Sequence, residues 1–379
     1  MIYADNAATT QISTLAFEKM IPYLREEYGN ASSHYNLGMR ARRAIEHARN
    51  QVATAIGSKS DEIIFTSGGS EANSWVLQSV AEYFRGEVIH IITSKIEHPS
   101  ILSACYALES KGAEITYLPV NSNGQVDFNT LKMAVRPNTK LVSIMFANNE
   151  TGALQPIVDI GQYLQSKGIL FHTDAVQAVG HIPIKAEELC VDFLSASAHK
   201  FNGAKGTGFL YMREGVKIPA LIFGGGQEHC QRGGTENVAG IVALGYALEE
   251  NISEMENVNE RLSKFIKLTI SGLREAIPDI QINCDRANRL AGTLNITFPN
   301  ASGEAMMNLL DLKGICVSTS SACNSGKDEP SHVLLALGLS EKQAKSSIRI
   351  SYGRYNTVDD VEQVINAFSD TYNNILSVR

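Results

Sequence analysis

The stretch "EIIFTSGGSEANSWVLQSVAEYF" at residues 62–84 decides the fold, because a short apolar run, a turn and an amphipathic segment follow one another in it. The same order recurs at 88–112 and again at 141–168. Short apolar runs that alternate with helical patterns are typical of βαβ units, which build a mostly parallel sheet with right-handed crossovers. The sequence therefore predicts an α/β protein organised around such a sheet.

Two further apolar runs extend this pattern toward the C-terminus, "VDFLSAS" at 191–197 and "GTGFLYM" at 206–212. Glycine-rich turns separate them, as expected between neighbouring strands. We expect one large α/β domain over residues 15–250.

The order of elements changes after a long helical pattern at about 236–275. Short strand-like and helical segments then follow without the earlier alternation, which is typical of a smaller α+β domain. We expect residues 1–14 and 251–379 to form it. Within it, the polar segment at about 318–332 reads as a mobile loop.

Composition and charge indicate which kinds of molecule this protein binds. Of the 379 residues 44% are hydrophobic and 19% charged, as in ordinary globular proteins, and the net charge of -7 gives no basic footprint for nucleic acid. The first residues lack the pattern of a secretory signal, and no apolar run approaches the roughly 18 residues of a membrane span. We expect a cytoplasmic protein that binds small molecules or proteins, with no direct nucleic-acid or membrane contact.

The cysteine pattern signals no metal site, because none of the six cysteines forms a C-x-x-C pair. Four of them fall in apolar helix or strand patterns and read as structural residues, namely Cys105, Cys190, Cys284 and Cys316. Cys230 lies in a polar turn and reads as a surface thiol without an assigned role. Cys323 sits among Ser, Asn and Gly in "SSACNSG", where packing has no use for it.

Three strand ends carry residues of complementary chemistry. "SGGSEAN" opens a helix whose free N–H groups suit a phosphate, Asp174 follows "GILFH", and Lys200 follows "VDFLSAS". Taken singly, the three features are more simply interpreted as a helix cap, a turn residue and a surface lysine. Ligands bind beyond the carboxyl ends of parallel strands. Pyridoxal phosphate needs this set: a lysine for its Schiff base, an acid for its ring nitrogen and an anion cradle.

Nine motifs occur in this order along the chain: "YADNAATT", "TSGGSEAN", "EHPSI", "NNETG", "HTDAVQ", "SASAHKFNGAKGTG", "GGGQEHCQRGGTEN", "SSACNSG" and "SSIRIS". Together they resemble the motif series of the cysteine desulfurases, the NifS/IscS-like enzymes. The resemblance implies a pyridoxal-phosphate enzyme of fold type I, in the class V aminotransferase group. It also implies a homodimer with its active sites near the subunit interface.

The resemblance also assigns roles. It implies Lys200 as the Schiff-base lysine, Asp174 as the partner of the pyridine nitrogen, and His98 as the histidine stacked on the ring. Cys323 is implied as the cysteine that accepts sulfur. The remaining matches are Gly69, Ser70, Ser197 and His199 in the phosphate cradle, Thr235 as a phosphate contact to the other subunit, Asn149 and Gln177 at the ring substituents, and Arg349 (with Asn149) at the substrate carboxylate.

A mobile position suits a sulfur-accepting cysteine, because the thiol must reach a buried cofactor and then turn outward to an acceptor. An unperturbed thiol is only a few per cent ionised at pH 7, so a neighbour must help to ionise Cys323. His332 in "EPSHVL" is one candidate, although a surface histidine at a helix start is the simpler interpretation.

The sequence thus predicts conversion of L-cysteine to L-alanine, with sulfur held on Cys323 as a persulfide and passed to an acceptor such as an iron–sulfur scaffold, for cluster assembly or tRNA thiolation. No resident metal is expected, and a transient iron–sulfur contact at Cys323 stays open. The alternatives are a selenocysteine lyase, another fold-type-I aminotransferase, or a non-catalytic sulfur-relay or scaffold subunit.

Overall fold

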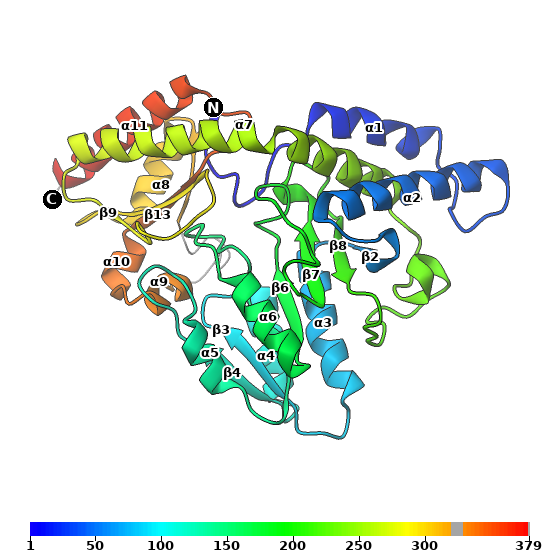
Figure 1. Ribbon diagram of the computed structural model, residues 1–379. Helices are drawn as coiled ribbons and strands as arrows, with labels where there is room; N and C mark the ends of the chain where they lie inside the picture. The colour runs from blue at the N-terminus through cyan, green and yellow to red at the C-terminus, as the bar shows by residue number, and fades with distance from the viewer. Residues whose placement is uncertain (320–328, 378–379) are drawn as a thin grey trace.

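The computed structural model describes residues 1–319 and 329–377. Figure 1 shows two sheets joined by the long helix α7 (Val238–Ala276), which crosses the top of both. The larger sheet lies below the N-terminal helices α1 (Thr14–Arg25) and α2 (Asn36–Ile56), and the smaller one lies at the other end of α7.

The larger sheet has seven strands in the order β2-β8-β7-β6-β5-β3-β4. All neighbours are parallel except β8, which is antiparallel to both β2 and β7. This confirms the predicted mostly parallel α/β sheet. The strands are β2 (Ile63–Thr66), β3 (His90–Ser94), β4 (Glu114–Leu118), β5 (Thr139–Ser143), β6 (Leu170–Asp174), β7 (Phe193–Ser197) and β8 (Gly208–Met212).

Helices cover both faces of this sheet. α3 (Gly69–Tyr83) and α4 (Pro99–Glu109) pack on one face, where Trp75 joins Ile64 and Ile91 in one apolar core. α2, α5 (Phe128–Ala134), α6 (Ile157–Lys167) and the first part of α7 pack on the other. Since both faces are buried, the strands carry continuous apolar runs rather than an alternating pattern.

The smaller sheet is antiparallel, in the order β12-β13-β10-β9, and a separate parallel pair joins β1 to β11. A second apolar core fills the space between this sheet, α8, α11 and the second part of α7. Its elements are β1 (Ile2–Tyr3), β9 (Gln281–Ile282), β10 (Thr293–Thr297), α8 (Gly303–Leu312), β11 (Ile315–Cys316), β12 (Ser318–Thr319), α9 (His332–Ala336), α10 (Glu341–Lys345), β13 (Ser347–Ser351) and α11 (Val358–Ser377).

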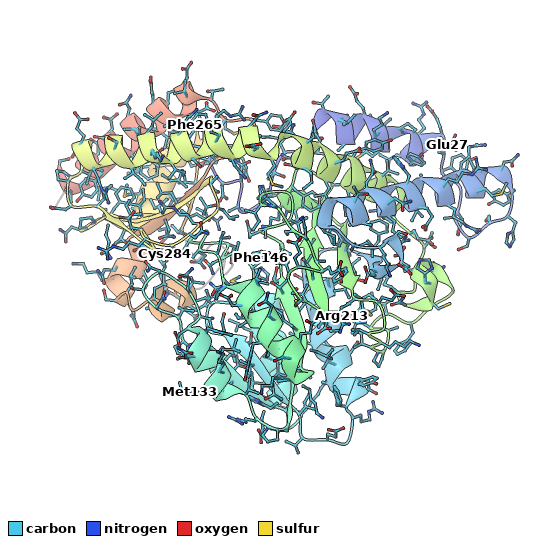
Figure 2. The ribbon with its side chains drawn as sticks, viewed as in Figure 1. Glu27, Met133, Phe146, Arg213, Phe265 and Cys284 are labelled. Atoms are coloured by element: carbon cyan, nitrogen blue, oxygen red, sulfur yellow. The ribbon has the colours of Figure 1, made fainter. Side chains whose placement is uncertain are left out.

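The helix α7 contributes to both cores. Its apolar side chains enter the first core as far as Leu248 and the second from Leu262 onward. Figure 2 shows Phe265 on the part of α7 above the smaller sheet, where its ring lies 5.9 Å from that of Tyr352. The residues near 250 therefore lie inside one continuous helix, and a domain division at that point stays a prediction.

Four of the five described cysteines lie where the sequence indicates. Cys105 is buried in α4, Cys284 is buried just after β9, Cys316 lies in β11, and Cys230 is exposed. The prediction for Cys190 is wrong, because this residue lies in a turn before β7 with φ 53° and is partly exposed. Its local apolar pattern comes from Leu189 and Val191, whose side chains are buried.

Candidate functional site

A cavity of about 540 Å³ opens at the carboxyl edge of the seven-stranded sheet. Five strands run in the same direction and end at this edge, namely β2, β3, β5, β6 and β7. The residues that follow these strands therefore lie close together at the cavity. Ten of the residues singled out by the sequence line this cavity: Gly69, Ser70, His98, Asn149, Asp174, Gln177, Ser197, His199, Lys200 and Arg349.

Lys200 ends the short helix η2 (Ala198–Lys200), which follows β7 directly. Its Nζ donates to the backbone oxygens of Ala7 and Ala8, at 2.7 Å each. The N-terminal segment therefore lies against the lysine, and its carbonyl groups fix the direction of the amine.

Asp174 is buried at the end of β6, and two donors hold its carboxylate. Asn73 Nδ2 donates to Oδ2 at 2.6 Å, and the backbone N–H of Val176 donates to Oδ1 at 3.0 Å. The same Asn73 amide also donates to Ser100 Oγ at 2.9 Å. The carboxylate of Asp174 accepts hydrogen bonds, so the amide nitrogen of Asn73, and not its oxygen, must face Asp174.

His98 is the N-cap residue of α4, and its ring nitrogen Nδ1 accepts from the backbone N–H of Ser100 at 3.2 Å. Ser100 Oγ lies 2.8 Å from the same nitrogen. Because a backbone N–H can only donate, the proton of the neutral ring lies on Nε2. Burial lowers the pKa of His98, and the nearby Lys200 and His332 lower it further, although Asp174 opposes them. The ring is therefore neutral near pH 7.

The anion cradle lies at the start of α3. Its N-cap is Gly68, which has no side chain to satisfy the first N–H groups of the helix, so these remain available to a phosphate. A Cβ at Gly69 would lie 2.5 Å from Val176 Cγ2, which explains glycine at this position. Burial lowers the pKa of the neighbouring His199 to about 4, with Lys200 and Lys205 acting in the same direction.

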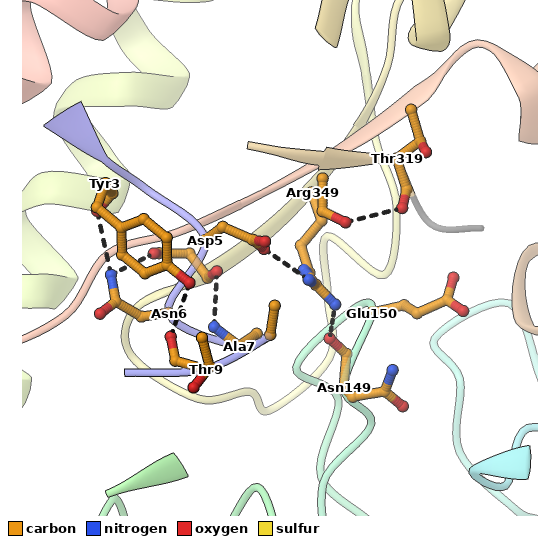
Figure 3. A network of polar contacts seen from close by, with 12 residues as sticks. Tyr3, Asp5, Asn6, Ala7, Thr9, Asn149, Glu150, Thr319 and Arg349 are labelled. Carbon is orange, nitrogen blue, oxygen red and sulfur yellow. Dashed lines mark hydrogen bonds and ion pairs between the residues drawn. The ribbon is translucent and has the colours of Figure 1, made fainter. Parts of the chain in front are cut away.

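Arg349 reaches the cavity from β13 of the smaller sheet (Figure 3). Its guanidinium donates to Asp5 Oδ1 at 2.6 Å and to the backbone oxygen of Asn149 at 2.9 Å. Its Nε is buried and has no hydrogen-bond partner among residues 1–319 and 329–377. The residue is only 5% exposed, so its guanidinium is held at the cavity wall by these protein contacts.

Two predicted residues are not among those that the structure brings to this cavity. Thr235 is exposed and does not line the cavity. Cys323 lies outside the described residues, so its place stays a prediction. Thr319, the last described residue before it, does line the cavity. His332 begins α9 as expected, is partly buried, and bonds through Nε2 to the backbone oxygen of Glu97 at 3.0 Å.

Sequence reasoning missed three polar side chains of the site. Asn73 lies one helical turn after Gly69 on α3, so helix periodicity could have found it. Ser100 follows His98 by two residues, the spacing of a local cap contact. Asp5 lies in "YADNAATT", whose place at the cavity only the fold reveals.

Two absences hold for the part of the chain that the structure describes. None of its helices is both long and apolar enough to span a membrane. None of its groups of three or more His, Cys, Asp or Glu side chains is arranged to hold a metal ion.

Comparisons with known proteins agree on one family. The model of the Aminotransferase class-V family matches residues 2–364. The "Cysteine desulfurase IscS" of Dictyoglomus turgidum is 48% identical over 364 residues, which are 96% of this chain and 92% of that relative. This chain belongs to the cysteine desulfurases of the class-V aminotransferase family.

Solved structures agree with this assignment. A "NIFS-LIKE PROTEIN" superposes with a TM-score of 0.92 at 40% identity and covers 100% of both chains. "SspA in complex with cysteine" superposes with a TM-score of 0.85 at 36% identity and covers 94% of this desulfurase and 100% of its own chain. The family uses pyridoxal phosphate, and the predicted fold class and cofactor are confirmed.

The cavity fits this cofactor on its own chemistry. It combines an amine at Lys200, a buried carboxylate at Asp174 and an uncapped helix start at Gly68. Gly69 leaves room where a Cβ would collide with the side chain of Val176. These are the three groups that hold an aldehyde, a pyridine nitrogen and a phosphate.

Proposed function

We propose that this desulfurase converts L-cysteine to L-alanine and transfers the sulfur to Cys323. The C–S bond of L-cysteine breaks and an S–S bond forms, so that L-cysteine and the Cys323 thiol give L-alanine and a Cys323 persulfide. The observation that carries the proposal is that Lys200, Asp174, His98 and Arg349 line one cavity, whose wall also includes Thr319.

Pyridoxal phosphate, when bound here, supplies a ring that stabilises negative charge at the α-carbon of the substrate. We assign Asp174 to hold the proton on the ring nitrogen, since its carboxylate is buried at the cavity and oriented by its two donors. Gly69, Ser70, Ser197 and His199 would hold the phosphate, and Asn149 and Gln177 the ring substituents.

Lys200 is assigned both to attach the cofactor and to move the α-proton with Nζ. The carbonyls of Ala7 and Ala8 keep that amine at one place, so the proton is taken and returned on the same side of the substrate. The neutral His98 ring carries its proton on Nε2. This nitrogen can therefore donate a proton to the substrate when the C–S bond breaks.

Arg349 is assigned to the substrate carboxylate. Its planar guanidinium suits a bidentate contact, and the bonds to Asp5 and Asn149 set its direction. Cysteine is the ligand named in the complex of the SspA relative, and the carboxylate of that amino acid needs such a partner.

A homodimer and a protein acceptor of the sulfur are also proposed. Thr235 is exposed, as a residue directed to a second subunit must be. Apolar side chains at Phe17, Ile21 and Leu24 recur on one face of α1 and are 49%, 41% and 62% exposed, a stripe that a second copy would cover. An acceptor such as an iron–sulfur scaffold and a cytoplasmic location stay predictions.

The test is to supply L-cysteine to the purified protein, measure alanine, and locate the added sulfur by peptide mass. We expect alanine and a gain of one sulfur on the peptide that contains Cys323. Cys323→Ala should abolish sustained alanine formation. Alanine formation without mass gain on Cys323 would contradict the proposal, and turnover unaffected by Cys323→Ala would favour an aminotransferase or a selenocysteine lyase.

A further inference from the structure

The proposed phosphate cradle contains an acidic residue, Glu71, whose negative charge would repel a bound phosphate. Glu71 lies in the first turn of α3, only 9% of its side chain is exposed, and it lines the same cavity as Gly69 and Ser70. Its Oε2 accepts from the backbone N–H of Ser67 at 2.8 Å. A carboxylate is thus bound at the helix end that should receive a phosphate. Two anions within one turn repel each other strongly in a partly buried site.

Arg232 neutralises this acid from a distant part of the chain. Its Nε donates to Glu71 Oε1 at 2.9 Å and its second nitrogen to Oε2 at 3.1 Å, a bidentate pair. The Arg232 side chain is 20% exposed. The bonds from Arg232 and Ser67 lower the pKa of Glu71 although burial raises it, so Glu71 is an anion and needs this partner.

The segment that carries Arg232 is itself anchored to the sheet. Glu228 is buried, and Arg49 donates to both of its carboxylate oxygens, at 2.7 and 2.9 Å. The backbone N–H of Phe65, in β2, donates to the same group at 2.8 Å. β2 leads directly into the cradle, so Arg232 is held in register with the helix start that it neutralises.

We propose that Arg232 sets the affinity of this site for the phosphorylated cofactor, by cancelling the charge of Glu71 at the helix end that receives the phosphate. Arg232 acts here as a positioning and charge-balancing residue. The inference rests on the proposed phosphate cradle and concerns affinity rather than the chemical step. It predicts that the two members of the pair have opposite effects on cofactor binding.

The experiment compares pyridoxal phosphate with pyridoxal, which lacks the phosphate, in titrations of the apoprotein. Arg232→Gln should raise the dissociation constant of pyridoxal phosphate about tenfold or more, the effect of a partly buried charge at a helix end. Glu71→Gln keeps an oxygen for Ser67 and removes the charge, so it should lower that constant. The double variant should return to within about twofold of the wild type, as cancelling effects require.

Pyridoxal is the matched control, and its dissociation constant should not change in any variant. If Arg232→Gln weakens both ligands alike, or if Glu71→Gln weakens pyridoxal phosphate, the inference is overturned. Should Arg232→Gln fail to fold, the sign of the Glu71→Gln effect still decides. A wild-type protein that binds the two ligands equally would instead refute the cradle itself.

Discussion

Replacing Arg349 by lysine tests how the substrate carboxylate is held. The lysine keeps the positive charge but presents one donor direction, whereas the guanidinium presents two parallel N–H groups. In the structure one terminal nitrogen donates to Asp5 and the other to the backbone oxygen of Asn149, and each of these nitrogens carries a second N–H group. A substrate carboxylate that accepts from both terminal nitrogens loses one charge-assisted bond in the variant.

Such a bond contributes about 1.5 to 3 kcal/mol when it is made to a charged group. Since 1.4 kcal/mol corresponds to a factor of ten, KM for L-cysteine should rise about 10- to 150-fold in Arg349→Lys. The carboxylate keeps the same charge and the same contacts before and during the reaction, so its binding is uniform and kcat should change little. Steady-state alanine formation over a range of L-cysteine concentrations measures both constants.

The matched control is Arg354→Lys, because the Arg354 side chain is only 9% exposed, forms ion pairs with Glu250 and Glu254, and does not line the cavity. It should leave KM within about twofold of the wild type. Thermal unfolding of both variants separates a loss of packing from a loss of binding. An unchanged KM with a large fall in kcat in Arg349→Lys would show that Arg349 does not hold the carboxylate.

Two further predictions concern stability. Glu228→Ala removes one partner of a buried ion pair with Arg49 and should lower the free energy of unfolding by about 3 to 5 kcal/mol, measured by urea denaturation; a loss below about 1 kcal/mol would contradict the pairing. Burial lowers the pKa of His172 from its usual 6.5 to about 3, so the unfolded chain takes up a proton that the folded one refuses, and stability should fall as pH drops below 6.5, by up to about 4 to 5 kcal/mol. His172→Asn should show a flatter dependence between pH 7 and pH 4, and identical slopes would disprove this.

The larger sheet was predictable because its strands are buried on both faces. Such strands show as continuous apolar runs, and their ends mark the site. The apolar run of β8 does not indicate the direction of this strand, because the run is the same in either orientation. The length of the connection at 198–207 does indicate it, since this connection is shorter than the dozen or so residues that a parallel crossover needs.

The hydrogen-bond partners of Lys200 could not be predicted from the sequence. Its Nζ bonds to the backbone oxygens of Ala7 and Ala8, and any residue type at these positions offers the same oxygen. Arg232 and Glu71 are separated along the chain and neither is unusual in its local pattern. Only the folded chain shows that they meet at the start of α3.

The N-terminal segment fixes the geometry between the two sheets at the site. Asp5 forms a parallel bridge to Ser351 on β13 and holds Arg349, so this end of the segment moves with the smaller sheet. Two and three residues later the carbonyls of Ala7 and Ala8 hold Lys200, on the larger sheet. Residues 5–8 form a turn, in which the backbone N–H of Ala8 donates to the backbone oxygen of Asp5 at 3.0 Å. A substrate bound between an amine site at Lys200 and a carboxylate site at Arg349 thus spans a distance set by this turn. Any change that lets the sheets shift against each other must open the turn first, and the site then loses its fit to an α-amino acid before either sheet loses its own core.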